Sequence, residues 1–184
     1  MDKSRLLLLL IFILCQQILF SQSVATTKGA NLWSASGSLD SQSANIYARF
    51  GGDRVKSINF RATYAQFLAD KLALGPSFGL THTGQNSNNS TGSWGIGPRL
   101  FYFADNGRPV FPYVGGGIDF ISVKQRNEVS SGFGTQLVLG TIIRKDHLGF
   151  FLELGLQTQN VKGSFRREKG KAIYFSIGFA GFLF

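Results

Sequence analysis

The sequence has few of the residues that metal centres, disulfide frameworks and thiol chemistry require. Its 184 residues include one cysteine, Cys15, and two histidines, His82 and His147. Cys15 lies in an apolar leader that we expect to be removed, so the mature chain has neither a thiol nor a disulfide. Leu14 stands where lipid-attachment signals carry a small residue, which disfavours acylation of Cys15. Because the two histidines are far apart and no mature cysteine accompanies them, we predict no metal and no cofactor.

Long apolar runs are also missing, apart from one at the start of the chain. Lys3 and Arg5 precede "LLLLLIFIL" (6–14), which has the length of a signal-peptide core, whereas a spanning helix needs about 20 residues. Small residues then allow cleavage after Ser21 or after Ala25. We therefore expect residues 1–21 to be a signal peptide, with cleavage between 21 and 25, and residues 22–31 to be a short periplasmic segment.

Low charge and little proline accompany abundant glycine and phenylalanine: 16% charged residues and 4 Pro, against 23 Gly and 18 Phe. Aromatic residues favour strands, and glycine permits tight turns and close backbone approach. Apolar and polar residues alternate with a period of two in eight segments, which predicts an all-β domain. The expected strands are 32–39, 57–67, 71–82, 92–103, 111–123, 132–143, 148–159 and 171–183.

The connections between these segments alternate in length. Those at 68–71, 104–109 and 144–147 are short, and those at 40–56, 83–92, 124–132 and 160–170 are long. An even number of strands with short turns at one end and long loops at the other is typical of a transmembrane barrel. We predict an antiparallel up-and-down β-barrel over residues 32–184, with periplasmic short turns. Eight strands exclude a wide diffusion pore, which needs about sixteen.

The two faces of the expected strands differ in composition. One is apolar, and the other carries small residues with four large charged ones, Arg61, Arg99, Asp119 and Glu153. A basic side chain facing lipid at the bilayer midplane costs about 2–4 kcal/mol, so the polar face should point into the barrel. Glycine and serine leave room there for the arginines, and we expect Asp119 and Glu153 to pair with them because unpaired buried charges are costly.

Two features interrupt the alternation. Pro76 and Pro98 fall inside expected strands, where proline removes a hydrogen-bond donor, and we predict a bulge at each. In the last segment the apolar residues change parity before Phe182. A bulge near Gly181 would return Phe182 and Phe184 to the lipid-facing side.

The stretches "LADKLALGPSFGL" (68–80) and "GIGPRLFYFADNGRPVFPYVGGGIDF" (95–120), with the terminal Phe184, resemble the small outer-membrane β-barrel proteins of the OmpA/OmpX-like group. The resemblance covers almost all of the mature chain. It implies the fold of an integral outer-membrane barrel. Our leading hypothesis is therefore an integral outer-membrane protein without enzymatic activity, in contact with outer-membrane lipid and lipopolysaccharide. The resemblance also implies that Phe182 and Phe184 belong to the C-terminal signal that the barrel-insertion machinery reads.

One predicted loop is strongly basic and offers a binding surface. It could bridge the phosphates of lipopolysaccharide or meet an anionic surface partner, or it is simply a solvated loop. We expect no nucleic-acid partner, because an exported chain rarely meets one. The basic residues are Lys162, Arg166, Arg167, Lys169 and Lys171, against Glu168 alone.

Two other functions remain open from the sequence. A secreted soluble barrel that binds a small apolar ligand would need the aromatic face turned inward. A lipid-modifying enzyme would use His82 with Ser87 or Ser90. The barrel-type lipid A deacylases carry a His-x-Ser pair, whereas Gly84 occupies the third position here, which disfavours the enzyme.

Overall fold

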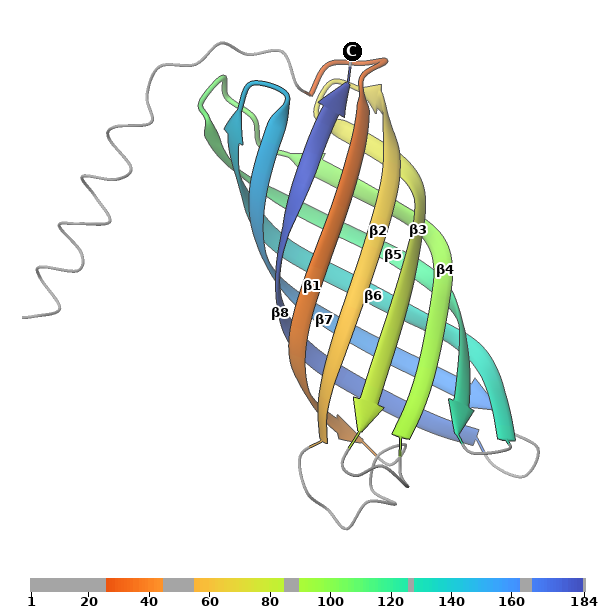
Figure 1. Cartoon of the computed structure of the whole chain (residues 1–184). Helices are drawn as coiled ribbons and strands as arrows, with labels where there is room; N and C mark the ends of the chain where they lie inside the picture. Colours follow the sequence, from red (N-terminus) through yellow and green to blue (C-terminus); the bar gives the residue numbers. More distant parts are fainter. Residues whose placement is uncertain (1–25, 45–54, 85–89, 126–127, 163–166, 184) are drawn as a thin grey trace, which may run out of the picture.

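Eight antiparallel strands close into a single barrel in the part of the chain that the structure describes (Figure 1). The computed structural model describes residues 26–44, 55–84, 90–125, 128–162 and 167–183. Each strand pairs with the next, and every residue of the first strand pairs with the last one. The strands are β1 (Asn31–Ala44), β2 (Val55–Ala69), β3 (Leu72–Gly84), β4 (Ser90–Phe103), β5 (Val110–Gln125), β6 (Glu128–Lys145), β7 (Leu148–Lys162) and β8 (Arg167–Leu183).

The predicted fold class is therefore confirmed. The signal peptide expected at 1–21, and also Arg166 and Phe184, lie outside the described residues. Among the residues that are described, no helix is long and apolar enough to cross a membrane.

The two ends of the barrel are built differently. The turn end carries the connections 70–71, 104–109 and 146–147, and it also holds the end of β8 at the top of Figure 1. The opposite, loop end carries the other connections. Strands run further toward the loop end than predicted, since β5 reaches Gln125 and β6 begins at Glu128. Much of the loops predicted at 124–132 and 160–170 is therefore strand. These strand ends were predicted as loops because polar residues occupy both of their faces, so apolar and polar residues do not alternate there.

Pro76 and Pro98 lie directly opposite each other in β3 and β4. The registers of β2 with β3 and of β4 with β5 are the same on both sides of the prolines, so the predicted bulges are wrong. Instead, the proline and the glycine before it have no paired residue on that neighbouring strand, because proline has no N–H to donate. A Cβ on Gly75 or Gly97, just before each proline, would overlap the neighbouring backbone. Glycine thus lets the adjacent strand pass closely, and no extra residue is needed.

Large apolar side chains cover the outside of the barrel, as the alternation predicts. Leu154 is 54% exposed, whereas the adjacent Glu153 is 9% exposed and points inward. This orientation is confirmed on all described strands. We call the outward group the apolar belt; its members include Trp33, Ile58, Phe60, Leu74, Phe78, Leu80, Trp94, Ile96, Leu100, Tyr102, Val114, Ile118, Phe120, Leu137, Leu139, Ile143, Leu152, Leu154, Leu156, Ile173, Phe175, Ile177, Phe179 and Leu183.

Inside the turn end, four fully buried rings form an aromatic plug: Phe67, Phe103, Phe111 and Phe182. The ring centroid of Phe103 lies 5.4 Å from that of Phe67 and 6.3 Å from that of Phe111. The prediction that a bulge turns Phe182 toward lipid is wrong, because β8 keeps one register with both neighbours through Gly181. Phe182 faces inward because the lumen at this level must be filled by large apolar groups.

Candidate functional site

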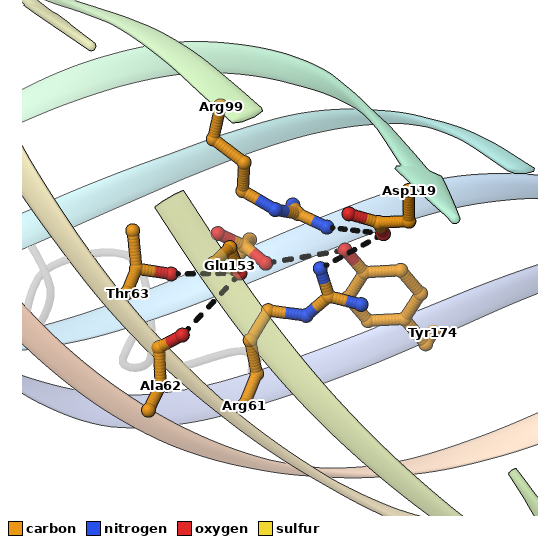
Figure 2. Close-up of polar contacts among 8 residues, drawn as sticks. Arg61, Ala62, Thr63, Arg99, Asp119, Glu153 and Tyr174 are labelled. Atoms are coloured by element: carbon orange, nitrogen blue, oxygen red, sulfur yellow. Dashed lines mark hydrogen bonds and ion pairs between the residues drawn. The ribbon is translucent and has the colours of Figure 1, made fainter. Parts of the chain in front are cut away.

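The middle of the lumen holds a charge cluster contributed by three strands. Asp119 of β5 accepts a hydrogen bond from Arg99 of β4 at 3.0 Å and from Arg61 of β2 at 3.3 Å, both at Oδ2 (Figure 2). The side chain of Arg99 is 2% exposed and that of Arg61 is 22% exposed. The structure thus brings together three of the four charged residues that the sequence placed in the lumen. Arg61 borders the cavities on both sides of the cluster, whereas Arg99 borders only the one toward the turn end.

Glu153 has a different environment from the one predicted. Its Oε2 accepts a hydrogen bond from the hydroxyl of Tyr113 at 2.9 Å. Its Oε1 accepts hydrogen bonds from the hydroxyls of Tyr174 and Ser176, each at 3.3 Å. Among the described residues Glu153 forms no ion pair with an arginine, so the predicted pairing is wrong for this carboxylate. Neutral hydroxyls satisfy it instead, and their inward parity is the signal that sequence reasoning overlooked.

Glycines on neighbouring strands make room for the large lumen side chains. A Cβ on Gly140 would overlap the ring of Tyr113, and a Cβ on Gly155 would overlap the ring of Tyr174. Each tyrosine therefore lies flat over a glycine and can direct its hydroxyl to Glu153. Glycines also make room for the arginines, since Arg61 lies over Gly79 and Arg99 lies over Gly117.

A second buried polar group closes the turn end. Asp105, in the turn between β4 and β5, accepts a hydrogen bond from the Thr26 hydroxyl at 3.1 Å and another from the Gly107 N–H at 2.8 Å. Arg144 of β6 forms an ion pair with Asp105 at 3.4 Å, and its guanidinium lies 5.5 Å from the ring centroid of Phe111. We call Thr26, Asp105 and Arg144 the turn-end latch. From the sequence, Asp105 is only one residue of the short connection expected at 104–109.

The space left in the lumen is small. Two cavities of about 30 Å³ each lie beside the charge cluster. One, toward the loop end, is lined by hydroxyl and amide side chains that include Ser38, Asn59 and Gln157. A volume of 30 Å³ is about the share of one molecule in liquid water, so these cavities suit water and no larger solute.

The remaining predicted residues lie on the outer wall or beyond the described residues. His82 is exposed on the outside of β3; Ser87 is outside the described residues, and the side chain of Ser90 is not among those described. Lys162, Lys169 and Lys171 are exposed, whereas the side chain of Arg167 is not described. Among the described residues, no three His, Cys, Asp or Glu side chains are grouped to hold a metal ion.

Comparison with solved structures identifies the fold. The chain is similar to the Neisserial surface protein A, with a TM-score of 0.62 and 16% identity over 84% of this chain and 99% of that one. It is also similar to the outer membrane protein OprG from Pseudomonas aeruginosa, with a TM-score of 0.55 and 12% identity over 86% and 98% of the two chains. No protein-family model and no curated protein matches the sequence. The shared feature is the fold, which is that of the small outer-membrane β-barrels.

Proposed function

We propose that this chain, which has the fold of the small outer-membrane β-barrels, is a non-enzymatic integral protein of the outer membrane that acts through its loop end. The observation that carries the proposal is the inverted polarity of the wall, with leucines such as Leu154 outside and Glu153 inside. Monomeric soluble proteins rarely expose contiguous apolar patches of more than a few hundred Å², whereas this belt surrounds the barrel.

The height of the belt supports a membrane location. On β8 the outward apolar residues run from Ile173 to Leu183. At about 3.3 Å per residue they cover about 33 Å of strand, and a tilt of about 40° reduces this to about 25 Å of height. This height matches the apolar band of outer-membrane barrels. The closed ladder also satisfies the strand backbone inside hydrocarbon, where water is absent.

The filled lumen supports a role at the surface over a role in transport. The aromatic plug occupies the turn end, the charge cluster occupies the middle, and the cavities beside that cluster have the size of a water molecule. A soluble barrel that carries an apolar ligand is disfavoured by the same contents, because its apolar face would have to line a large cavity. Roles that need no passage of a solute through the barrel include structural support of the envelope, adhesion and binding of an anionic surface partner.

The orientation proposed for the barrel places the turn end in the periplasm. Residues 26–30 lie at this end beside the turns, because Lys28 N–H donates to Asp70 and Lys71 N–H donates to Thr26. We also retain Phe182, together with Phe184, as the signal for the insertion machinery. Burial of Phe182 in the finished barrel is compatible with this role, since the signal is read before the strands close.

Spin labels at Leu154 and Gln157 test the membrane location in barrels refolded into lipid vesicles. The label at Leu154 should be accessible to oxygen, which concentrates in hydrocarbon, and protected from a water-soluble nickel relaxant. The label at Gln157 should show low accessibility to oxygen, because this side chain lines a polar cavity in the lumen that is shut off from hydrocarbon and too small to admit the nickel relaxant. Water access at Leu154 together with lipid immersion at Gln157 would refute the proposal. Cell fractionation, with gel mobility measured before and after boiling, gives an independent check.

A further inference from the structure

Three exposed lysines gather on the outer wall of β7 and β8 at the loop end. Lys162, Lys169 and Lys171 alternate with the buried Val161, Gly170 and Ala172, so all three point away from the lumen. In the register of these strands, Lys169 lies opposite Asn160, and Lys171 lies opposite Thr158. We call the three lysines the lysine patch. Two of its members belong to β8 and one to β7, so paired strands fix the backbone that carries them.

The patch begins where the apolar belt ends. Leu156 and Ile173 face each other across β7 and β8, and both are exposed apolar residues. The next outward pair toward the loop end is Thr158 and Lys171. Outward residues on one strand follow each other at about 7 Å, so Lys171 lies directly above the last apolar row. Groups at that level meet the lipid headgroups, and a lysine stem can cover apolar surface while its ammonium reaches the phosphates.

The surroundings of the patch contain neutral polar groups and an aromatic ring. The hydroxyls of Thr135 and Thr158 are 2.8 Å apart on the outer surface of β6 and β7. Phe133 is exposed and lies opposite Asn160. The acidic side chains that the structure describes lie in the lumen or in turns, and none of them is beside the patch. They are Asp70, Asp105, Asp119, Asp146 and Glu153.

The opposite wall is different at the same level. On β2, β3 and β4 the belt continues through Ile58, Leu80 and Trp94, and the next described outward residues on β3 and β4 are His82 and Gly92. Among the described side chains of β4 and β5, this wall carries the single exposed lysine Lys124, opposite Gly92, whereas the β7–β8 side carries three lysines.

We propose that the lysine patch binds the phosphates of a diphosphorylated outer-leaflet glycolipid, the lipid A part of lipopolysaccharide, on the β7–β8 side of the barrel. This inference rests on the proposed membrane location and makes it specific. Lysine binds phosphate as a point charge, and each basic residue near an anionic membrane surface strengthens binding about fivefold. Two lysines removed together should weaken binding about 25-fold.

The test compares two double variants of the refolded, full mature barrel in neutral detergent. Lys169→Ser/Lys171→Ser removes two charges from the patch, and Lys28→Ser/Lys145→Ser removes two exposed charges at the turn end, away from the outer leaflet. Binding of diphosphoryl lipid A is measured by native mass spectrometry across a titration. The patch variant should bind about 25-fold more weakly, and the control should remain within about twofold of the parent chain.

Further arms separate the phosphate from other sources of affinity. Dephosphorylated lipid A should bind the parent chain no better than it binds the patch variant. The patch variant and the control variant should bind phosphatidylglycerol with similar affinity, and the same should hold for inorganic phosphate. Lys169→Arg/Lys171→Arg should retain binding. Equal weakening by both double variants, or equal binding of phosphorylated and dephosphorylated lipid A, would overturn the proposal.

Folding and insertion of each variant are checked by the heat-dependent gel shift and by the spin-label readout. All substituted lysines are exposed, so the variants should insert like the parent chain. Normal insertion of the patch variant with unchanged lipid A binding would reject the role of the lysine patch and leave the proposed function standing. Failure of the parent chain itself to insert into vesicles would instead reject the proposed function.

Discussion

Asp119 accepts hydrogen bonds from two lumen arginines, so its replacement by alanine provides the sharpest test of the charge cluster. Arg99, whose side chain is 2% exposed, would lose its carboxylate partner. Arg61, whose side chain is 22% exposed, could turn toward the polar cavity at its side. Leaving one buried charge without its partner costs about 3–5 kcal/mol, and we expect Asp119→Ala to lower the free energy of unfolding by this amount.

The reciprocal substitutions should cost less. Arg99→Met leaves Asp119 paired with Arg61, and Arg61→Met leaves it paired with Arg99, so each should cost about 1–3 kcal/mol. The double variant Arg99→Met/Asp119→Leu removes the buried pair as a unit, and replacement of such pairs by apolar groups is often close to neutral. It should therefore be more stable than Asp119→Ala, with a coupling of about 2 kcal/mol or more between the two positions.

Equilibrium unfolding in urea, with the barrels in lipid vesicles, measures these differences. The fluorescence of the outward Trp33 and Trp94 reports loss of the lipid environment, and the gel shift reports the folded fraction. A loss below about 1 kcal/mol for Asp119→Ala would refute the reasoning, because it falls below the cost of one unsatisfied buried charge. The reasoning would also be refuted if the loss of unfolding free energy in the double variant equalled the sum of the losses in the two single variants.

Further substitutions test the plug, the glycine contacts and the latch. Phe182→Ala should cost about 3–5 kcal/mol in urea unfolding and Phe182→Leu less than half of that, and equal midpoints for Phe182→Ala and the parent would contradict the plug. Gly155→Ala should cost about 1–3 kcal/mol because its methyl meets a tyrosine ring, whereas Gly92→Ala, whose Cβ meets nothing within 4 Å, should unfold like the parent. Asp105→Ala should increase hydrogen exchange of residues 26–30, and unchanged protection there would show that the latch does not hold this segment.

The wall of the barrel could be predicted from the sequence because its outer environment is uniform. Every outward position at the height of the belt faces lipid, so outward residues such as Leu152 and Leu154 are apolar and differ clearly from the inward Glu153. The same alternation predicts that Arg61 and Arg99 lie in the lumen, where the structure has them. A period of two needs no knowledge of which strand lies beside which.

The lumen was harder to predict because its contents change along the barrel axis. Small and charged residues fill the middle, while rings fill the turn end, so the inward Phe182 resembled an outward residue displaced by a bulge. The partners of Glu153 also depend on strand register, which brings Tyr113 and Tyr174 from separate strands to one carboxylate. Loop-end strands were missed because their outward residues are polar, as at Lys169, and no longer alternate in hydrophobicity.

The pairing of β1 with β8 joins residues far apart in the chain, from 152 positions for Asn31 with Leu183 to 126 positions for Ala44 with Gly170. Closing a segment of this length costs about 4–5 kcal/mol in chain entropy, and no contact along the seam offsets this until the last strand arrives. Before that moment β1 presents an edge whose backbone groups hydrocarbon cannot satisfy. Assembly should thus be slow and cooperative, and a chain cut before β8 should yield aggregated or degraded protein in place of a seven-stranded intermediate.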